Sequence, residues 1–278
     1  MTPAGLLNAL TRVGGVVLLA VLLYVGLVQA DVLRSPFDPV VRGDVALARG
    51  NAPGLRVLFV GNSFTSWNGM PELVGDLAAL DRGAERLFAV GYTAGGRQLS
   101  DAADDDELGR LLAEVRWDVV VLQEQSALLS FPRAQRLAET HPFARTLDRR
   151  IDRGGARTML FMTWGYRDGD RANVAGDTYN EMQTRLANGY YELAEELDAA
   201  VAPVGAAWAA AVHDRPGLHL WAHDGRHPGR RGSYLAACVF YAALTGRDPA
   251  ASTFTGGLPR GEAAFLQRIA TQAVANRQ

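Results

Sequence analysis

Cysteine is almost absent from this sequence of 278 residues, which contains a single one, Cys238. One cysteine excludes an intramolecular disulfide bond and a zinc site built from several thiolates. Cys238 stands in the apolar run 235–244, where a cysteine commonly packs as a small hydrophobic residue. We therefore expect it to be buried in the core rather than to act as a nucleophile.

The sequence also lacks an excess of either charge. Its 28 Lys and Arg residues stand against 30 Asp and Glu residues, for a formal net charge of -2. Proteins that bind nucleic acid usually carry a domain-wide basic excess, so no nucleic-acid partner is expected. His219 and His223 are four positions apart, but Pro216, Gly217 and Gly225 argue against a helix there, so a metal site is not expected. No complete phosphate-binding glycine motif is present. We expect neither a metal nor an organic cofactor.

Charge is missing altogether from residues 13–28, which directly follow Arg12. This apolar run ends at residues 28–30 (Val-Gln-Ala), which resemble a signal-peptidase site. Its length is also close to the ~18–20 residues that span a bilayer. Residues 1–30 are therefore interpreted as a signal peptide or an N-terminal membrane anchor. Either places the rest of the chain outside a bacterial cytoplasm: periplasmic, extracellular or anchored facing outward.

Residues 31–54 contain several prolines and glycines and are predicted as an irregular linker. From residue 55 to 278, short apolar runs alternate with longer amphipathic segments. Strands are expected at 55–60, 87–90, 118–122, 158–162 and 201–204. Helices are expected at 70–82, 105–114, 131–153, 179–197, 206–213, 233–245 and 262–276. This alternation predicts an α/β domain of three layers, α/β/α, with a mostly parallel five-stranded sheet.

Functional groups in such sheets gather at the carboxyl ends of the strands. Ser63 directly follows the first predicted strand and precedes a helix, although a serine there often serves only as a helix cap. Asp224 and His227 lie three positions apart on a glycine-containing turn far along the chain. Such a carboxylate can accept the Nδ1–H of the ring and leave the other ring nitrogen free as a base.

The segments VLFVGNSFT at 57–65 and DGRHPGRRG at 224–232 closely resemble the SGNH hydrolase family, a branch of the GDSL esterases and lipases. The resemblance covers nearly all of residues 55–245. It implies a flavodoxin-like SGNH hydrolase fold and a serine hydrolase whose nucleophile is Ser63. It also implies that Asp224 and His227 complete the catalytic triad.

The resemblance implies an oxyanion hole as well. In the family, the backbone N–H of the serine and of a glycine in the second block hold the oxyanion, which here points to Ser63 and Gly96, with Gly95 as the alternative. The usual third block, Gly-x-Asn-Asp, is replaced by Gln-Glu-Gln-Ser at 123–126. A glutamine amide can replace the asparagine donor, with Gln125 at the asparagine's position and Gln123 as the other candidate.

A generic α/β-hydrolase has the same order of triad residues, but its nucleophile lies in Gly-x-Ser-x-Gly, whereas Thr65 occupies the second glycine's position here. Asn62, Trp164 and Tyr166 are further candidates for substrate contacts. Aromatic residues beside strand ends can stack on a sugar ring, and packing in the core is the alternative for each.

These observations predict an exported serine esterase that removes short acyl groups, acetyl above all, from carbohydrate or cell-envelope substrates. The substrate class rests on analogy with the family and on the export signal. An O-acyltransferase using the same triad is one alternative, and a catalytically silent glycan-binding module is another. The expected partner is a small-molecule or glycan ester, and any membrane contact is expected only through an uncleaved N-terminal segment.

Overall fold

The computed structural model describes residues 37–43 and 45–276. The predicted signal peptide or anchor at residues 1–30 lies outside this range. Residues Met1–Asp38 form one unit and Pro39–Gln278 a second, and the fold reported below is that of the second unit. Within the described residues, no helix combines the length and the apolar character that a membrane span requires.

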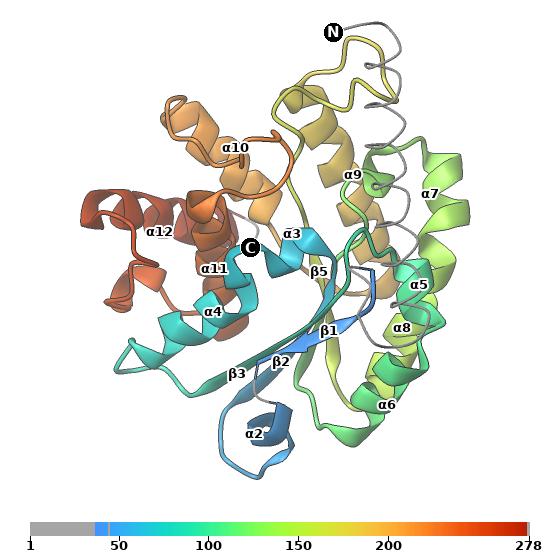
Figure 1. Cartoon of the computed structure of the whole chain (residues 1–278), viewed down its shortest axis with the longest axis vertical. Helices are drawn as coiled ribbons and strands as arrows, with labels where there is room; N and C mark the ends of the chain where they lie inside the picture. Colours follow the sequence, from blue (N-terminus) through green and yellow to red (C-terminus); the bar gives the residue numbers. More distant parts are fainter. Residues whose placement is uncertain (1–36, 44, 277–278) are drawn as a thin grey trace, which may run out of the picture. The chain divides into compact units, whose positions relative to one another are not determined.

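The second unit is built on a six-stranded sheet with the order β1-β3-β2-β4-β5-β6. Figure 1 shows β2 and β3 running side by side in this sheet. The strands are β1 (Val40–Arg42), β2 (Leu55–Gly61), β3 (Leu87–Thr93), β4 (Val119–Leu122), β5 (Arg157–Phe161) and β6 (Ala200–Ala202). β2 to β6 are mutually parallel and match the five predicted strands. Their order, β3-β2-β4-β5-β6, is that of flavodoxin-like sheets.

The predicted count of five strands needs one correction. β1 pairs antiparallel with β3, Val41 lying opposite Tyr92, and so adds a sixth strand at the sheet edge. It falls inside residues 31–54, which were expected to be irregular and which also contain the short helix α2 (Val45–Arg49). A three-residue strand leaves almost no periodicity in the sequence, so the sheet edge that it meets decides its conformation.

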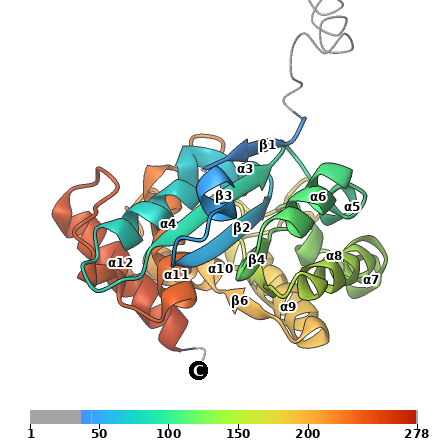
Figure 2. The same cartoon turned by 90° about the horizontal axis from the view of Figure 1, so that it is seen from below.

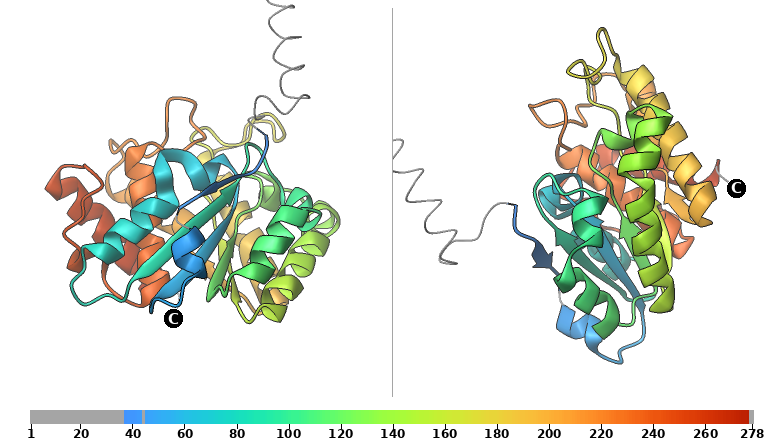
Figure 3. Two further views of the ribbon diagram at one scale, coloured as in Figure 1. Left: turned by 60° about the horizontal axis from the view of Figure 1, so that its bottom comes forward. Right: turned by 90° about the vertical axis from the view of Figure 1, so that its right-hand side faces the viewer.

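Helices cover both faces of the sheet (Figures 2 and 3). One layer contains α4 (Met70–Ala79), α10 (Val204–Asp214), α11 (Arg230–Thr245) and α12 (Arg260–Ala275). The other contains α5 (Leu99–Ala103), α6 (Asp106–Glu114), α7 (Arg133–Glu139), α8 (His141–Arg153) and α9 (Tyr179–Leu197). Short turns of helix complete the chain: α3 (Ser63–Ser66), η1 (Trp67–Gly69), η2 (Leu128–Ser130) and η3 (Pro249–Ala251). The three-layer α/β/α prediction is confirmed.

One predicted helix is divided in the structure. Residues 131–153 form α7 and α8, which meet at Thr140. Pro142 lies in the first turn of α8, where a backbone N–H has no partner within the helix, so the N–H that proline lacks is not needed. Inside a continuous helix, the same proline would remove a hydrogen bond. The break therefore follows from the proline.

The core between the sheet and the α11 layer is aromatic. Phe240 of α11 packs edge-on against Phe59 of β2 and Phe161 of β5, with ring centroids 5.1 Å and 4.8 Å apart. Cys238, on the same helix, is fully buried, as expected, and this burial raises the pKa of its thiol. The thiolate required for nucleophilic chemistry is therefore disfavoured.

Candidate active site

Ser63 is positioned by the junction of β2 and α3 at the carboxyl edge of the sheet. Asn62 is the cap of this short helix, and its Oδ1 accepts the N–H of Phe64 at 3.0 Å. The other side of the same amide, Nδ2, donates to the carbonyl oxygen of Arg97 at 2.9 Å. Asn62 is only 2% exposed, which leaves it no surface for a substrate. This corrects the prediction that Asn62 contacts the substrate: its side chain has a structural role.

Asp224 and His227 lie on a closed turn between α10 and α11. Trp221 and Pro228 form an antiparallel bridge at its base, and Gly225 adopts a φ of +70°, which favours glycine. The Oδ1 of Asp224 accepts the backbone N–H of His227 at 3.0 Å, so the carboxylate turns back toward the histidine of its own loop. The spacing of three residues thus brings the two side chains together.

The structure brings Ser63, His227 and Asp224 into one hydrogen-bonded series. The Nε2 of His227 lies 2.8 Å from the Oγ of Ser63, and its Nδ1 lies 2.5 Å from the Oδ2 of Asp224. A carboxylate can only accept, so Nδ1 carries the proton and Nε2 is free to accept from the serine hydroxyl. This is the arrangement in which a serine can be deprotonated as it attacks a carbonyl.

The charge of Asp224 is maintained by its hydrogen bonds. Partial burial opposes ionisation, but the bonds from the His227 ring and from the N–H groups of Arg226 and His227 outweigh it, so the pKa of the carboxyl lies below its ordinary value. Asp224 is therefore ionised at neutral pH and can stabilise a positive charge on the imidazole.

Three backbone N–H groups beside Ser63 have no acceptor in the part of the chain that the structure describes: those of Ser63, Gly95 and Gly96. The glycines lie in a turn closed by the N–H of Arg97 on the carbonyl of Ala94, 3.4 Å away. Gly96 has a φ of +68°, and a Cβ there would meet no atom within 4 Å, so the backbone conformation rather than crowding requires the glycine. Gly95 and Gly96 both remain candidates for an oxyanion donor.

The two glutamine candidates differ sharply in their surroundings. Gln123 is 1% exposed, and its Oε1 accepts from the N–H of Asn62 at 2.9 Å and from the hydroxyl of Thr65 at 2.8 Å. Its Nε2 donates to the backbone oxygen of Glu124. Both ends of the Gln123 amide are therefore used in hydrogen bonds that join the ends of β2 and β4. This corrects the prediction that Gln123 could donate to the oxyanion.

Gln125 is half-buried at the end of the same strand. Its Oε1 accepts the N–H of Ala127 at 2.8 Å, which fixes the amide group, and its Nε2 has no acceptor among residues 37–43 and 45–276. An amide held by its oxygen with the nitrogen unpaired can donate to a substrate. Gln125 is therefore the remaining side-chain candidate for the oxyanion hole.

Glu124, between these glutamines, is a residue that the sequence interpretation did not single out. Its buried Oε1 accepts the N–H of Leu99 at 3.1 Å and that of Gln125 at 2.7 Å, which ties the start of α5 to the tip of β4. Burial raises the pKa of this carboxyl to about 7, although both hydrogen bonds act against the shift. A carboxylate two residues after a buried strand was the available signal.

The aromatic candidates are buried behind the site. Trp164 is fully buried and lies between the rings of Phe64 and Trp208, with centroids 4.9 Å and 4.1 Å away. Its Nε1 donates to the carbonyl of Arg226, beside His227. Tyr166 is 6% exposed and hydrogen-bonds to Ser126. This corrects the prediction that Trp164 and Tyr166 contact the substrate. Both residues pack in the core, which was the alternative interpretation.

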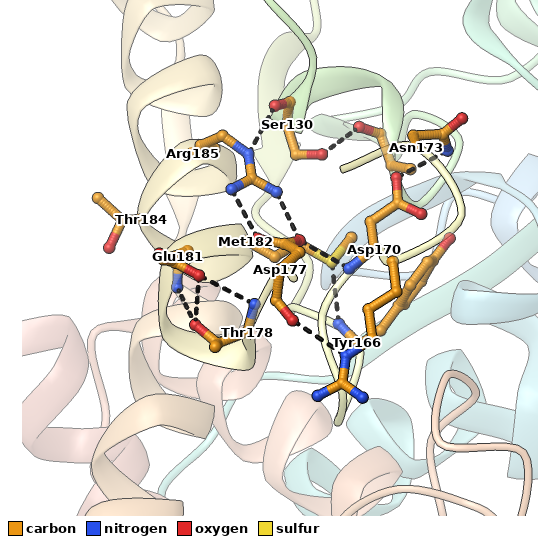
Figure 4. A network of polar contacts seen from close by, with 12 residues as sticks. Ser130, Tyr166, Asp170, Asn173, Asp177, Thr178, Glu181, Met182, Thr184 and Arg185 are labelled. Carbon is orange, nitrogen blue, oxygen red and sulfur yellow. Dashed lines mark hydrogen bonds and ion pairs between the residues drawn. The ribbon is translucent and has the colours of Figure 1, made fainter. Parts of the chain in front are cut away.

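The loop that carries Tyr166 is held by a network of polar contacts around Asp177 (Figure 4). The Asp177 carboxylate accepts two bonds from Arg185 at 2.9 Å and 2.7 Å and one from the N–H of Asp170 at 2.7 Å. The Nε of Arg185 donates to the carbonyl of Ser130, which joins the loops after β4 and β5. Much of the loop's charge is thus used internally. Among the described residues, no group of three or more His, Cys, Asp or Glu side chains could hold a metal ion.

Comparison with known proteins supports the fold and the class of enzyme. No protein-family profile matches the sequence, and no curated protein shows a significant sequence match. Among solved structures, a protein of Slackia heliotrinireducens assigned as an SGNH hydrolase is 28% identical, with a TM-score of 0.57 over 69% of this chain and 100% of that chain. A DUF4886 family protein from Bacteroides uniformis is 20% identical, with a TM-score of 0.69 over 80% and 95% of the two chains.

An acetyl xylan esterase, AlAXEase, shares the fold at 16% identity and a TM-score of 0.51, over 68% of this chain and 100% of its own. The sheet order, the serine at the end of β2 and the similarity to the Slackia protein converge on one assignment. Together they support a serine hydrolase of the SGNH hydrolase family.

Proposed function

We propose that the protein is an esterase that hydrolyses short acyl esters, with Ser63 as nucleophile, His227 as general base and Asp224 as the group that orients the imidazole. The observation that carries this proposal is the continuous series of hydrogen bonds from Ser63 Oγ to His227 Nε2, at 2.8 Å, and from His227 Nδ1 to Asp224 Oδ2, at 2.5 Å.

The reaction begins when His227 Nε2 takes the hydroxyl proton of Ser63 as its Oγ attacks the ester carbonyl. The N–H of Ser63, the N–H of Gly96 or Gly95 and the Nε2 of Gln125 donate to the oxyanion that forms. The intermediate collapses as His227 returns the proton to the leaving alcohol. Water, deprotonated by His227, then attacks the acyl-enzyme; the bond from the acyl carbon to Ser63 Oγ breaks, His227 returns the proton to Oγ, and the carboxylic acid is released.

The packing around Ser63 supports a short acyl group. Phe64, Trp164 and Trp208 are stacked and buried, so they fill the space behind the nucleophile. The side chains of His227 and Asp224 are 26% and 42% exposed, so a substrate can reach the triad from solvent. A long acyl chain gains affinity only from a deep apolar pocket, at about 0.8 kcal/mol per buried methylene. Acetyl esters of carbohydrates, the class of ester for which the acetyl xylan esterase AlAXEase is named, fit this shape.

The test is hydrolysis of p-nitrophenyl acetate by the purified protein, together with labelling by a fluorophosphonate that reacts with activated serines. We expect one label per chain, on the peptide that contains Ser63, and loss of hydrolysis in Ser63→Ala. Ser66→Ala, in the same short helix, is the matched control and should keep its activity. Full activity in Ser63→Ala would refute the proposal. Acyl transfer to an added sugar would instead indicate an O-acyltransferase, and an inert wild-type protein would indicate a glycan-binding module.

We also propose that the enzyme acts outside the cytoplasm, on cell-envelope or extracellular carbohydrate. The support is the uncharged run 13–28 after Arg12. Residues 1–35 fused to a reporter that is active only after export should yield an active reporter. A reporter retained in the cytoplasm would contradict this proposal, and N-terminal sequencing of the exported protein would distinguish cleavage from anchoring.

A further inference from the structure

Trp67 lies flat against the imidazole of His227. The two ring centroids are 4.1 Å apart and the ring planes differ by 13°, so the rings are stacked. Phe64 contacts the same imidazole at a centroid distance of 5.4 Å, in a tilted arrangement. Trp67 is 39% exposed, so it forms the solvent side of this contact. Stacking on any ring would remove part of the apolar surface of this indole from water. The choice of the His227 ring in particular requires a further explanation.

The backbone that presents Trp67 is held in an unusual conformation. Asn68, the next residue, has a φ of +55° and a ψ of 19°, in the left-handed region that non-glycine residues rarely adopt, and Gly69 follows with a φ of +64°. Asparagine tolerates this region better than most residues, yet the conformation still costs free energy. Strain of this kind persists where surrounding contacts enforce it.

Those contacts connect Trp67 to the loop of His227. The Nδ2 of Asn68 donates to the carbonyl of Pro228 at 3.0 Å and to the hydroxyl of Ser233 at 2.9 Å. Ser233 donates in turn to the carbonyl of Trp67 at 3.2 Å. The segment that carries the indole is therefore tied to the residue that follows His227 and to the first turns of α11.

We propose that Trp67 is a positioning residue for His227, held in place by Asn68. This inference rests on the proposed function, in which His227 becomes an imidazolium as Ser63 attacks. The face of an indole carries negative electrostatic potential and attracts a cation stacked on it. The neutral imidazole of the resting enzyme gains less from the contact than the imidazolium does. Trp67 therefore stabilises the transition state more than the ground state and acts on kcat rather than on KM.

A different role for the exposed indole predicts a different measurement. If Trp67 were only a platform on which a sugar or acyl group stacks, its removal would raise KM and leave kcat largely unchanged. The stack on His227 instead predicts a lower kcat, whichever leaving group the ester carries. The two roles are separated by measuring kcat and KM with p-nitrophenyl acetate, because its aromatic leaving group would stack on a platform and report the loss of that platform as a higher KM.

The experiment compares Trp67→Leu, Trp67→Phe and Asn68→Gly in the full-length protein. Trp67→Leu should lower kcat roughly 3- to 30-fold, with KM changed by no more than about twofold, the range expected for loss of a cation–π contact. Trp67→Phe retains an aromatic face and should recover most of this loss. Asn68→Gly allows the same backbone conformation but removes the side-chain donor, so it should lower kcat as well. Tyr191→Leu, at an exposed aromatic residue of α9, is the control and should keep wild-type kcat.

The same substitution in a His227→Ala background tests whether Trp67 acts through the histidine. Trp67→Leu should then cause no further loss of the residual rate. The proposal is overturned if Trp67→Leu keeps wild-type kcat, raises KM alone, or lowers the residual rate of His227→Ala by the full factor. It is also overturned if Trp67→Phe is as impaired as Trp67→Leu while thermal denaturation shows both to be folded. Full activity in Ser63→Ala or His227→Ala would instead refute the proposed function itself, so the two failures are distinguishable.

Discussion

The side-chain amide of Asn62 donates to the carbonyl oxygen of Arg97 across 2.9 Å, and this bond joins the residue before the proposed nucleophile to the glycine turn. The N–H of Asn62 in turn donates to the Oε1 of Gln123 at 2.9 Å. The buried side chains of Asn62 and Gln123 thereby connect the ends of β2, β3 and β4. The relative positions of the N–H groups of Ser63 and Gly96 follow from this connection.

Gln125 is expected to contribute to the rate and little to stability. Gln125→Glu keeps an oxygen for the N–H of Ala127 but removes the free N–H donor and adds a negative charge, whereas Gln125→Ala removes the amide altogether. Both variants should lower kcat, by about 10²–10³ if Nε2 donates to the oxyanion. Steady-state kinetics and thermal denaturation are the measurements. Wild-type kcat in both variants would mean that backbone N–H groups alone form the oxyanion hole.

Gln123 is expected to behave in the opposite way. Gln123→Ala leaves the N–H of Asn62 and the hydroxyl of Thr65 without their buried acceptor, which should reduce the free energy of unfolding by about 1–3 kcal/mol or more. Urea denaturation measures this change, with Gln135→Ala as the control, at a partly exposed residue of α7 whose amide donates to Glu139 of the same helix. Unchanged stability in Gln123→Ala would show that these bonds contribute nothing net to the fold.

Asp224 should control the rate through the tautomer of His227. In Asp224→Asn the amide can donate to Nδ1, which would place the ring proton on Nε2, where it cannot accept from Ser63. We expect kcat to fall by about 10²–10⁴ with little loss of stability. Asp214→Asn removes a carboxylate from another Asp–His pair, that of Asp214 with the exposed His213, and should leave kcat unchanged. Equal kinetics in the two variants would contradict the role of Asp224.

Glu124 should make stability depend on pH. Burial raises its pKa from 4.5 to about 7, so the folded protein retains a proton that the unfolded chain releases above pH 4.5. The stability contributed by this proton is fully present below pH 4.5 and is lost as the pH rises through about 7. Glu124→Gln is neutral at every pH and lacks this dependence.

Between about pH 5 and pH 8, the free energy of unfolding of the wild type should therefore fall by about 2–3 kcal/mol relative to Glu124→Gln. Urea denaturation of both proteins across this range measures the difference. Parallel pH profiles for the wild type and the variant would contradict the raised pKa.

Acyl-chain length should limit the rate. We expect kcat/KM to fall as the acyl chain lengthens beyond about four carbons, because the stacked rings of Phe64, Trp164 and Trp208 occupy the space behind Ser63. A series of p-nitrophenyl esters from acetate to palmitate, at fixed detergent concentration, is the measurement. A maximum at about eight carbons or longer would favour a lipase-like enzyme with a deeper pocket.

The sequence by itself determined the sheet and the identity of the candidate triad. Buried parallel strands leave continuous apolar runs, so β2 to β6 were recognisable from local composition. Ser63 was recognisable by its place after a strand, and Asp224 and His227 by a spacing that allows contact within a single turn. The segment of β1 was not recognisable, because three residues carry no usable pattern.

Only the tertiary structure decided the roles of the side chains around the triad. Gln123 and Gln125 are alike in the sequence, yet the bond from Asn62 engages one amide, whereas the Nε2 of the other is left unpaired. Trp164 and Trp67 both follow strand ends, yet one is buried against Trp208 and the other stacks on His227. Each of these outcomes depends on contacts between segments far apart in the chain. Burial and hydrogen-bond partners arise from the three-dimensional packing, so residue type and spacing alone do not specify them.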